Sequence, residues 1–287
     1  MLDLTPRALE AGDRLIQFGY ARKTAVRGRV DFARAFHDPP TVVVTPVWEG
    51  SGREVGHAET IDRVSREGFV LYSNNGAANY YVSWIAVGYS GAGRHSDNVN
   101  YVQIGDLVLE MGKTRKTAVS LTVPLRYPFA QPPNIQVSPF WEGQRSGVGH
   151  AETIGRVARR EFDVWSDNRA SNYFVSWIAA GTLRTDLAPH EPVPGWFIQD
   201  FPVRGMLVRT IRGRMQDGSP NRNTIGIGIP PFAAPPTIVV TPFWEGQRRG
   251  VTHAETLDMV EPHAVRLTAG NGADNYFVSM LAIGRPG

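Results

Sequence analysis

The sequence contains no cysteine among its 287 residues. A chain without cysteine cannot form a disulfide scaffold, a cysteine-ligated zinc site or a thiol nucleophile. No apolar run approaches the roughly 18 residues of a membrane-spanning segment, so we expect no membrane insertion. Without crosslinks, we expect stability to come from apolar surface buried between parts of the chain.

Targeting and catalytic signals are also missing. Residues 1–10 (MLDLTPRALE) lack a basic stretch followed by an apolar one, so no signal peptide is expected. The sequence has no G-x-S-x-G elbow, P-loop, Rossmann fingerprint or H-E-x-x-H helix. We therefore expect neither an enzyme nor a bound cofactor or metal, and a hydrolase is the least favoured function.

The charge pattern argues against a nucleic-acid partner. The chain carries 30 basic and 27 acidic residues, for a formal net charge of +3. Of the basic residues, 27 are arginines that are scattered rather than clustered, whereas nucleic-acid binders usually present a basic face. The 30 glycines and 21 prolines indicate a loop-rich chain, and helical periodicity is almost absent.

The chain consists of three copies of one unit. Residues 36–88 align without gaps on 129–181 and on 232–284, and 22 of the 53 columns are identical in all copies. The offsets are 93 and 103 residues, too long for a solenoid repeat and long enough for a small domain. We therefore predict three units, over residues 1–90, 91–184 and 185–287.

Each unit has the pattern of a β-strand protein. Short runs that alternate, or that are rich in β-branched and aromatic residues, recur at the spacing typical of an antiparallel sandwich. The sequence Asn74-Asn75-Gly76 resembles a hairpin turn, and a positive φ would explain the identity of Asn75. The predicted strands lie at 15–18, 101–104 and 196–199; at 24–32, 117–125 and 224–229; at 42–44; at 69–72, 162–165 and 265–268; and at 80–87.

The repeated blocks resemble the H-type lectin domain, known from snail agglutinins and discoidins. The opening Phe36, Pro39-Pro40 and Val42, the step Gly68-Phe69 and the closing Val82 to Gly88 (VSWIAVG) match the family pattern. The second copy keeps the closing motif, and the third has Met280-Leu281-Ala282 in place of Trp-Ile-Ala. The resemblance covers about 55 residues of each unit.

The resemblance implies a fold and a class of activity. The family folds as an antiparallel β-sandwich, forms trimers and binds N-acetylgalactosamine or related sugars in clefts near subunit boundaries. The expected fold is therefore all-β, with three tandem H-type lectin-like sandwiches arranged as an intrachain pseudo-trimer. The family's sugar-contacting arginine falls near Gly56 or His57, and its Trp-His loop is shorter here, so its ligand residues are not carried over.

The repeated His-Ala-Glu-Thr motif supplies the first candidate site. If the motif lies on a strand, the histidine and the glutamate two residues later face the same side. Three interpretations remain open: a structural contact between units, a carbohydrate site, or a ring of three imidazoles around a metal ion. The residues are His57 and Glu59, His150 and Glu152, and His253 and Glu255.

A second candidate group surrounds the Trp-Glu-Gly motif. A tryptophan can stack on the apolar face of a pyranose, while asparagine can hydrogen-bond its hydroxyls. The alternative is that the tryptophan packs in a seam between units; Trp84, by contrast, is expected in the core. The candidates are Trp48 and Asn79, Trp141 and Asn172, and Trp244 and Asn275.

Repetition of these groups favours binding over catalysis, because weak sites gain avidity when several engage together. We expect a multivalent carbohydrate-binding adhesion protein that recognises a surface glycan or polysaccharide. The expected setting is a phage or phage-like particle assembled in the cytoplasm, with other particle proteins as partners, or non-classical secretion. The alternative is a structural fibre or spike component without sugar binding.

Overall fold

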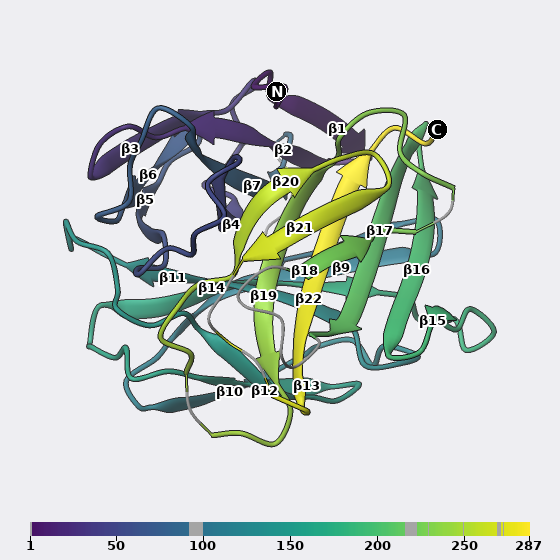
Figure 1. Cartoon of the computed structure of the whole chain (residues 1–287). Coiled ribbons are helices and arrows are strands. Elements are labelled where there is room, and N and C mark those ends of the chain that lie inside the picture. Colours follow the sequence, from purple (N-terminus) through teal and green to yellow (C-terminus); the bar gives the residue numbers. More distant parts are fainter. Residues whose placement is uncertain are drawn as a thin grey trace.

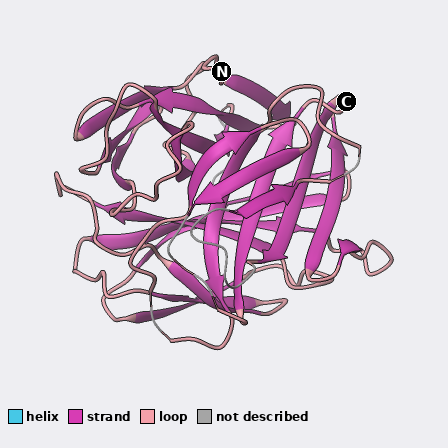
Figure 2. Ribbon diagram, viewed as in Figure 1, coloured by secondary structure: helices cyan, strands magenta, loops and turns pink. Residues whose placement is uncertain are grey.

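The fold consists of β-strands. The computed structural model describes residues 2–91, 100–215, 223–228, 230–248, 250–268, 271 and 273–287. These ranges contain 22 strands in three sheets and no helix (Figures 1 and 2). The expected all-β class is confirmed. A helix long and apolar enough to cross a membrane is likewise absent from these ranges.

We call the segments 1–90, 91–184 and 185–287 repeats 1, 2 and 3. Repeat 1 holds β1 (Arg7–Ala11), β2 (Arg14–Arg22), β3 (Arg27–Asp31), β4 (Thr41–Trp48), β5 (Thr60–Val64), β6 (Gly68–Tyr72) and β7 (Tyr80–Tyr89). Repeat 2 holds β8 (Asn100–Ile104), β9 (Leu107–Arg115), β10 (Ser120–Pro124), β11 (Asn134–Trp141), β12 (Thr153–Val157), β13 (Glu161–Trp165) and β14 (Tyr173–Gly181). Repeat 3 holds β15 (His190–Val193), β16 (Trp196–Val203), β17 (Met206–Arg214), β18 (Asn223–Gly226), β19 (Thr237–Trp244), β20 (Thr256–Val260), β21 (Ala264–Thr268) and β22 (Tyr276–Gly284).

Upstream of each core, the sequence predicted one strand too few in repeats 1 and 2 and two too few in repeat 3. The predicted strand at 15–18 lies in β2, but that at 101–104 is β8, whose counterpart is β1. β9 was missed because six consecutive residues from Leu107 are buried, so the strand lacks the alternation that marks a half-exposed strand. The prediction of a hairpin turn at residues 74–76 was also wrong, because the flanking strands β6 and β7 belong to different sheets.

Each sheet is built from two repeats. A layer of four or five strands from one repeat continues into a layer of three strands from another. Repeat 3 extends the sheet of repeat 1, repeat 1 extends that of repeat 2, and repeat 2 extends that of repeat 3. Each repeat therefore pairs with both of the others in a closed cycle. The strand orders are β1-β2-β7-β4-β20-β21-β18, β8-β9-β14-β11-β5-β6-β3 and β15-β16-β17-β22-β19-β12-β13-β10.

The junctions between repeats are parallel. β4 pairs with β20, β11 with β5 and β19 with β12, whereas the pairs within each repeat are antiparallel. The antiparallel pairing expected within each unit is therefore present, and the parallel pairs between repeats are a feature that the sequence did not predict. An unpaired edge strand exposes backbone donors and acceptors, and here the edge strand of one repeat finds its partner in another repeat.

A repeated hydroxyl reinforces the contact between repeats. Ser138 Oγ accepts a hydrogen bond from Val44 N (2.8 Å), Thr241 Oγ1 accepts one from Val137 N (2.9 Å), and Thr45 Oγ1 accepts one from Val240 N (2.7 Å). Each hydroxyl thus satisfies a backbone amide in the neighbouring repeat. Because the three hydroxyls come from β4, β11 and β19, the same bond recurs at all three boundaries.

Two apolar clusters fill the interior. Within repeat 1, β6 and β7 pack face to face through Phe69 and Trp84, whose ring centroids lie 5.8 Å apart, in a sandwich-like arrangement. Trp84 is fully buried, as predicted. A second cluster joins the other faces of the larger layers and includes Ile85, Ile178 and Leu281, one from each repeat.

We predict that Gly147→Ala destabilises the protein by about 1–3 kcal/mol, since overpacking forces the surrounding backbone to shift. A Cβ at this position in repeat 2 would lie 2.9 Å from the Ser73 Cα in repeat 1. Gly149→Ala is the control, because nothing lies within 4 Å of its added Cβ. Denaturant unfolding curves measure both effects, and equal effects would contradict close packing at this boundary.

Candidate functional site

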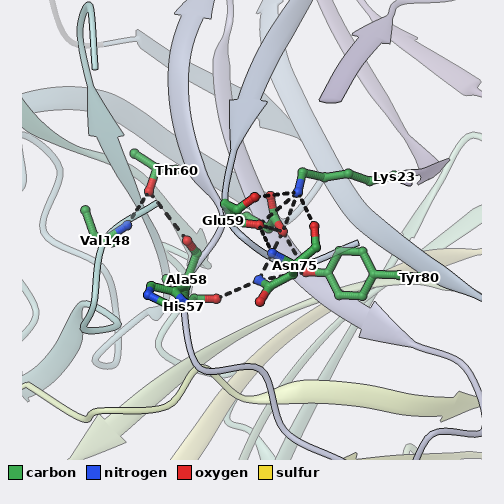
Figure 3. Close-up of polar contacts among 9 residues, drawn as sticks. Lys23, His57, Ala58, Glu59, Thr60, Asn75, Tyr80 and Val148 are labelled. Atoms are coloured by element: carbon green, nitrogen blue, oxygen red, sulfur yellow. Dashed lines mark hydrogen bonds and ion pairs between the residues drawn. The ribbon is translucent and has the colours of Figure 1, made fainter. Parts of the chain in front are cut away.

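Glu59 lies at the centre of a buried polar network (Figure 3). Its Oε1 accepts hydrogen bonds from the Tyr80 hydroxyl (2.6 Å) and the Ser73 hydroxyl (2.5 Å). The Lys23 ammonium, which directly follows β2, lies 3.6 Å from the same oxygen. The carboxylate is therefore held by an ammonium and two hydroxyls, as a buried charge requires.

Asn75 completes this network. Its Nδ2 donates to the His57 carbonyl (2.9 Å) and lies 3.2 Å from the Tyr80 hydroxyl and 3.3 Å from Glu59 Oε1. Among the described residues, Arg204 is the only non-glycine with a positive φ, so the explanation of Asn75 by turn geometry was wrong. Its repetition reflects the hydrogen bonds of its side chain.

Repeat 2 contains the same network. Glu152 accepts hydrogen bonds from Tyr173 (2.6 Å) and Ser166 (2.6 Å), and Lys116 lies 3.7 Å from its second oxygen. Burial lowers the pKa of Lys116, and Glu152 opposes that shift. Burial, reinforced by the adjacent carboxylate, raises the pKa of Tyr173 well above its usual value, so this hydroxyl stays protonated and donates.

Repeat 3 differs at the position of the lysine. Met215 N donates to the Tyr276 carbonyl as Lys116 N donates to that of Tyr173, so a methionine takes the place of the lysine. The sequence also has Ala269 where the other repeats have the network serine. Glu255 keeps hydrogen bonds from Tyr276 and from Asn271 (3.3 Å).

The loss of the cation changes the ionisation of Glu255. Burial raises the pKa of Glu255 to about 7, and the nearby carboxylate of Glu54 adds to the shift. Glu54 belongs to repeat 1 and stands where the other repeats have Gly147 and Gly250. The boundary between repeats 3 and 1 thus contains a carboxyl group that titrates near neutrality.

The expected pairing of His57 with Glu59 on one strand face was wrong. β5 begins at Thr60, so both residues precede the strand; His57 is half-buried, whereas Glu59 is buried. The motif instead joins repeats, because Ala58 bridges to Val148 and Thr60 Oγ1 accepts a hydrogen bond from Val148 N (3.1 Å). The same contacts involve Ala151 with Val251 and Ala254 with Val55; the half-buried His150 and His253 precede them.

The three glutamates line one small cavity. The cavity measures about 30 Å³, and each repeat contributes one alanine, one valine, one proline and one glutamate to its lining. Across the described ranges, no group of three or more His, Asp or Glu side chains is arranged to hold a metal ion. The interpretation as a ring formed by His57, His150 and His253 is therefore not supported by this geometry.

Trp48 and Asn79 are bonded to each other. Trp48 Nε1 donates to Asn79 Oδ1 (3.2 Å), and Asn79 Nδ2 donates to the Glu49 carbonyl (2.7 Å). Trp48 also packs edge-on against Tyr80 of its own repeat. These two hydrogen bonds of Asn79 hold the Trp-Glu-Gly turn. The bond from the tryptophan recurs between Trp141 and Asn172 (3.0 Å) and between Trp244 and Asn275 (3.0 Å).

A cleft of about 770 Å³ lies between repeats 1 and 2, and we call it the 1–2 cleft. Pro40 of repeat 1 lines it, opposite Lys113 and Phe140 of repeat 2. The Lys113 ammonium lies 4.4 Å from the centre of the Phe140 ring and 3.6 Å from the carboxylate of Glu142, the glutamate of the Trp-Glu-Gly motif. The cleft therefore combines apolar walls with a paired cation and anion.

The equivalent 2–3 cleft, between repeats 2 and 3, measures about 390 Å³. Pro133 takes the place of Pro40, and Arg212 and Phe243 take those of Lys113 and Phe140. The Arg212 guanidinium lies 4.5 Å from the centre of the Phe243 ring. The same cation-on-phenylalanine arrangement thus occurs at two boundaries.

At the boundary between repeats 3 and 1, a tyrosine stands in the position of these cations. Tyr20 pairs with Ser83 as Lys113 pairs with Ser176. Its buried hydroxyl donates to the Pro236 carbonyl (2.5 Å), so the side chain bridges the two repeats. Burial raises the pKa of Tyr20 above its usual value, which keeps the hydroxyl protonated.

The lysines were not among the site residues predicted from the sequence. The chain has only three, Lys23, Lys113 and Lys116, and Lys23 and Lys116 are separated by the 93-residue offset of the repeats. Extending the ungapped alignment upstream of residue 36 would have paired them. Two thus lie in the carboxylate networks and the third lies in the 1–2 cleft.

Comparison with known proteins assigns no family. Neither a scan of protein-family models nor a search of curated proteins finds a match for this chain. The geometry of its own residues therefore carries the functional argument.

We predict that stability falls as the pH rises from about 4.5 to 7. Folding raises the pKa of Glu255 from 4.5 to about 7, so the folded state binds more protons than the unfolded state across this interval. Ionisation of Glu255 therefore lowers the free energy of unfolding by about 3 kcal/mol by pH 7, compared with a side chain that stays neutral. Glu255→Gln removes this loss, so the free energy of unfolding of the variant increasingly exceeds that of the wild type up to pH 7, and the difference is constant above pH 7. Unfolding free energies at pH 5 and pH 8 measure the difference.

Glu152→Gln is the matched control. This substitution leaves the buried Lys116 ammonium without its counter-charge, so it destabilises the protein at both pH values. Parallel stability curves for the wild type and Glu255→Gln between pH 5 and pH 8 would contradict the raised pKa.

Proposed function

We propose that this chain is a multivalent carbohydrate-binding protein whose ligand sites are the 1–2 and 2–3 clefts. Its three repeats take the places of the three subunits of an H-type lectin trimer, as an intrachain pseudo-trimer. The observation that carries the proposal is the recurrence, at two boundaries, of a cleft with proline and phenylalanine walls and a cation beside a glutamate.

The chemistry of these clefts suits a sugar. A pyranose has an apolar face that packs on aromatic and proline side chains, and hydroxyls that bond to charged and polar groups. In the 1–2 cleft, Phe140 and Pro40 offer the apolar surface, and Lys113 and Glu142 offer a donor and an acceptor. Both volumes fall in the range of small-molecule sites, about 300–1,000 Å³.

The sequence-predicted site residues have a supporting role in this proposal. Glu59 and Asn79 already bond within repeat 1, and their counterparts do so in the other repeats. Their contribution is to position the Trp-Glu-Gly turns, from which Glu142 and Glu245 reach Lys113 and Arg212. Two clefts on one chain allow avidity for a glycan-covered surface.

We predict that Lys113→Tyr combined with Arg212→Tyr abolishes glycan binding. The substitutions place a tyrosine where Tyr20 stands at the boundary between repeats 3 and 1, at which its hydroxyl bridges to Pro236. The two tyrosine side chains fill both clefts. A glycan array that includes bacterial polysaccharides, probed at high protein density, measures binding. Arg160→Tyr, at an exposed position outside both clefts, is the control for an added tyrosine and keeps binding.

Two outcomes oppose the proposal. Absence of signal from the wild-type protein across the array would contradict carbohydrate binding and favour a structural component of a particle. Binding that survives the double substitution, in a variant with an unchanged melting temperature, would place the sugar outside the clefts.

A further inference from the structure

The two clefts differ in charge. The 1–2 cleft is lined by two acids and two bases: Asp62, Glu142, Arg63 and Lys113. In the described part of the chain, Arg212 is the one charged residue that lines the 2–3 cleft. The first cleft is therefore balanced, and the second carries a single positive charge.

The sequence explains this difference. Repeat 2 has Gly155 where repeat 1 has Asp62, and a Cβ at Gly155 would lie 2.7 Å from the indole of Trp165. Arg156, the counterpart of Arg63, is paired with Glu161 (2.5 Å) and Asp163 (2.9 Å) and does not line the cleft. One acid and one base are thus absent from the 2–3 cleft, and the two remaining charged counterparts are Arg212 and Glu245.

Arg212 is held in place but incompletely bonded. Its guanidinium lies over two rings, 4.5 Å from the centre of Phe243 and 5.4 Å from that of Phe277. Its ion pair with Glu245 is long, at 3.7 Å, and Glu245 is exposed and does not line the cleft. Among the described residues, Arg212 Nε is buried and has no hydrogen-bond partner.

The rest of the 2–3 cleft is apolar with a few neutral hydrogen-bonding groups. Phe197 is one of the few large apolar side chains that remain exposed (38%), and it lines the cleft together with Pro189. Gln199 and Thr210 supply an amide and a hydroxyl. These walls suit a sugar ring, and the single cation suits a carboxylate attached to it.

We propose that the 2–3 cleft binds an acidic saccharide, a uronic or sialic acid unit, whose carboxylate is held by Arg212. This inference rests on the proposed function and names the ligand class of one of its two clefts. An arginine holds a carboxylate through two parallel hydrogen bonds, and the phenylalanines fix its plane before the ligand arrives. The balanced 1–2 cleft takes a neutral sugar.

Matched probes test the charge requirement on the intact chain. Titration calorimetry compares methyl glucuronide with methyl glucoside, and N-acetylneuraminic acid with its methyl ester. At one site per chain, the acidic member of each pair binds at least about tenfold more tightly than the neutral member, as expected for a charge-assisted hydrogen bond. Raising the salt concentration reduces the preference.

Substitutions assign the preference to one side chain. Arg212→Gln loses the acidic preference, whereas Arg212→Lys keeps the charge but lowers affinity because the two parallel bonds are lost. Arg160→Gln, at an exposed position outside both clefts, is the control and leaves the preference intact. Asp62→Asn provides a gain-of-function test, since it gives the 1–2 cleft a net positive charge. Its retained Oδ1 can still accept the hydrogen bond from Gly143 N (2.7 Å). This variant binds two acidic sugars per chain instead of one.

The outcomes separate this inference from the function on which it rests. If neutral and acidic sugars bind equally, or if Arg212→Gln and Arg212→Lys leave the preference unchanged, the acidic assignment is overturned while carbohydrate binding stands. If neither member of any pair binds and the array is also blank, the proposed function fails as well.

Discussion

The parallel pairing between repeats is the contact on which the rest of the structure depends. β5 pairs with β11, β12 with β19, and β20 with β4. Without its neighbours, each repeat would expose the backbone of two strand edges and lose its amide-to-hydroxyl bonds at Thr45, Ser138 or Thr241. The repeats are therefore interdependent parts of one fold. The clefts, which draw residues from two repeats each, exist only where such a boundary forms.

The three boundaries are alike in backbone and different in chemistry. Repeats 1 and 2 neutralise their buried glutamates with Lys23 and Lys116, whereas repeat 3 has Met215 at that position. The boundary between repeats 3 and 1 lacks that lysine, and it is also the boundary that Tyr20 bridges. Repeats 3 and 1 are not consecutive in the chain, so this boundary is held by the β4–β20 pairing and by side-chain contacts such as the Tyr20 bridge.

The sequence predicted the elements better than their partners. Periodicity and β-branched composition identified β4, β6, β7 and the buried Trp84, because these patterns depend on local geometry and burial, whereas β5 was not among the predicted strands. Strand exchange between repeats leaves no local signal, since β5 has the same sequence pattern whether it pairs within its repeat or with β11. The contacts of Glu59 also could not be predicted, because they involve residues distant in the sequence. A glutamate in a repeated motif was a reasonable ligand candidate until Lys23, Ser73 and Tyr80 were seen to surround it.

Calorimetric unfolding of the intact chain tests the interdependence of the repeats most directly. If the parallel junctions hold one cooperative fold, heating gives a single transition whose calorimetric enthalpy equals the van't Hoff enthalpy. Three separable domains would instead give several transitions, or a calorimetric enthalpy about threefold larger than the van't Hoff value. That second result would contradict the dependence of each repeat on its neighbours, and with it the origin of the clefts.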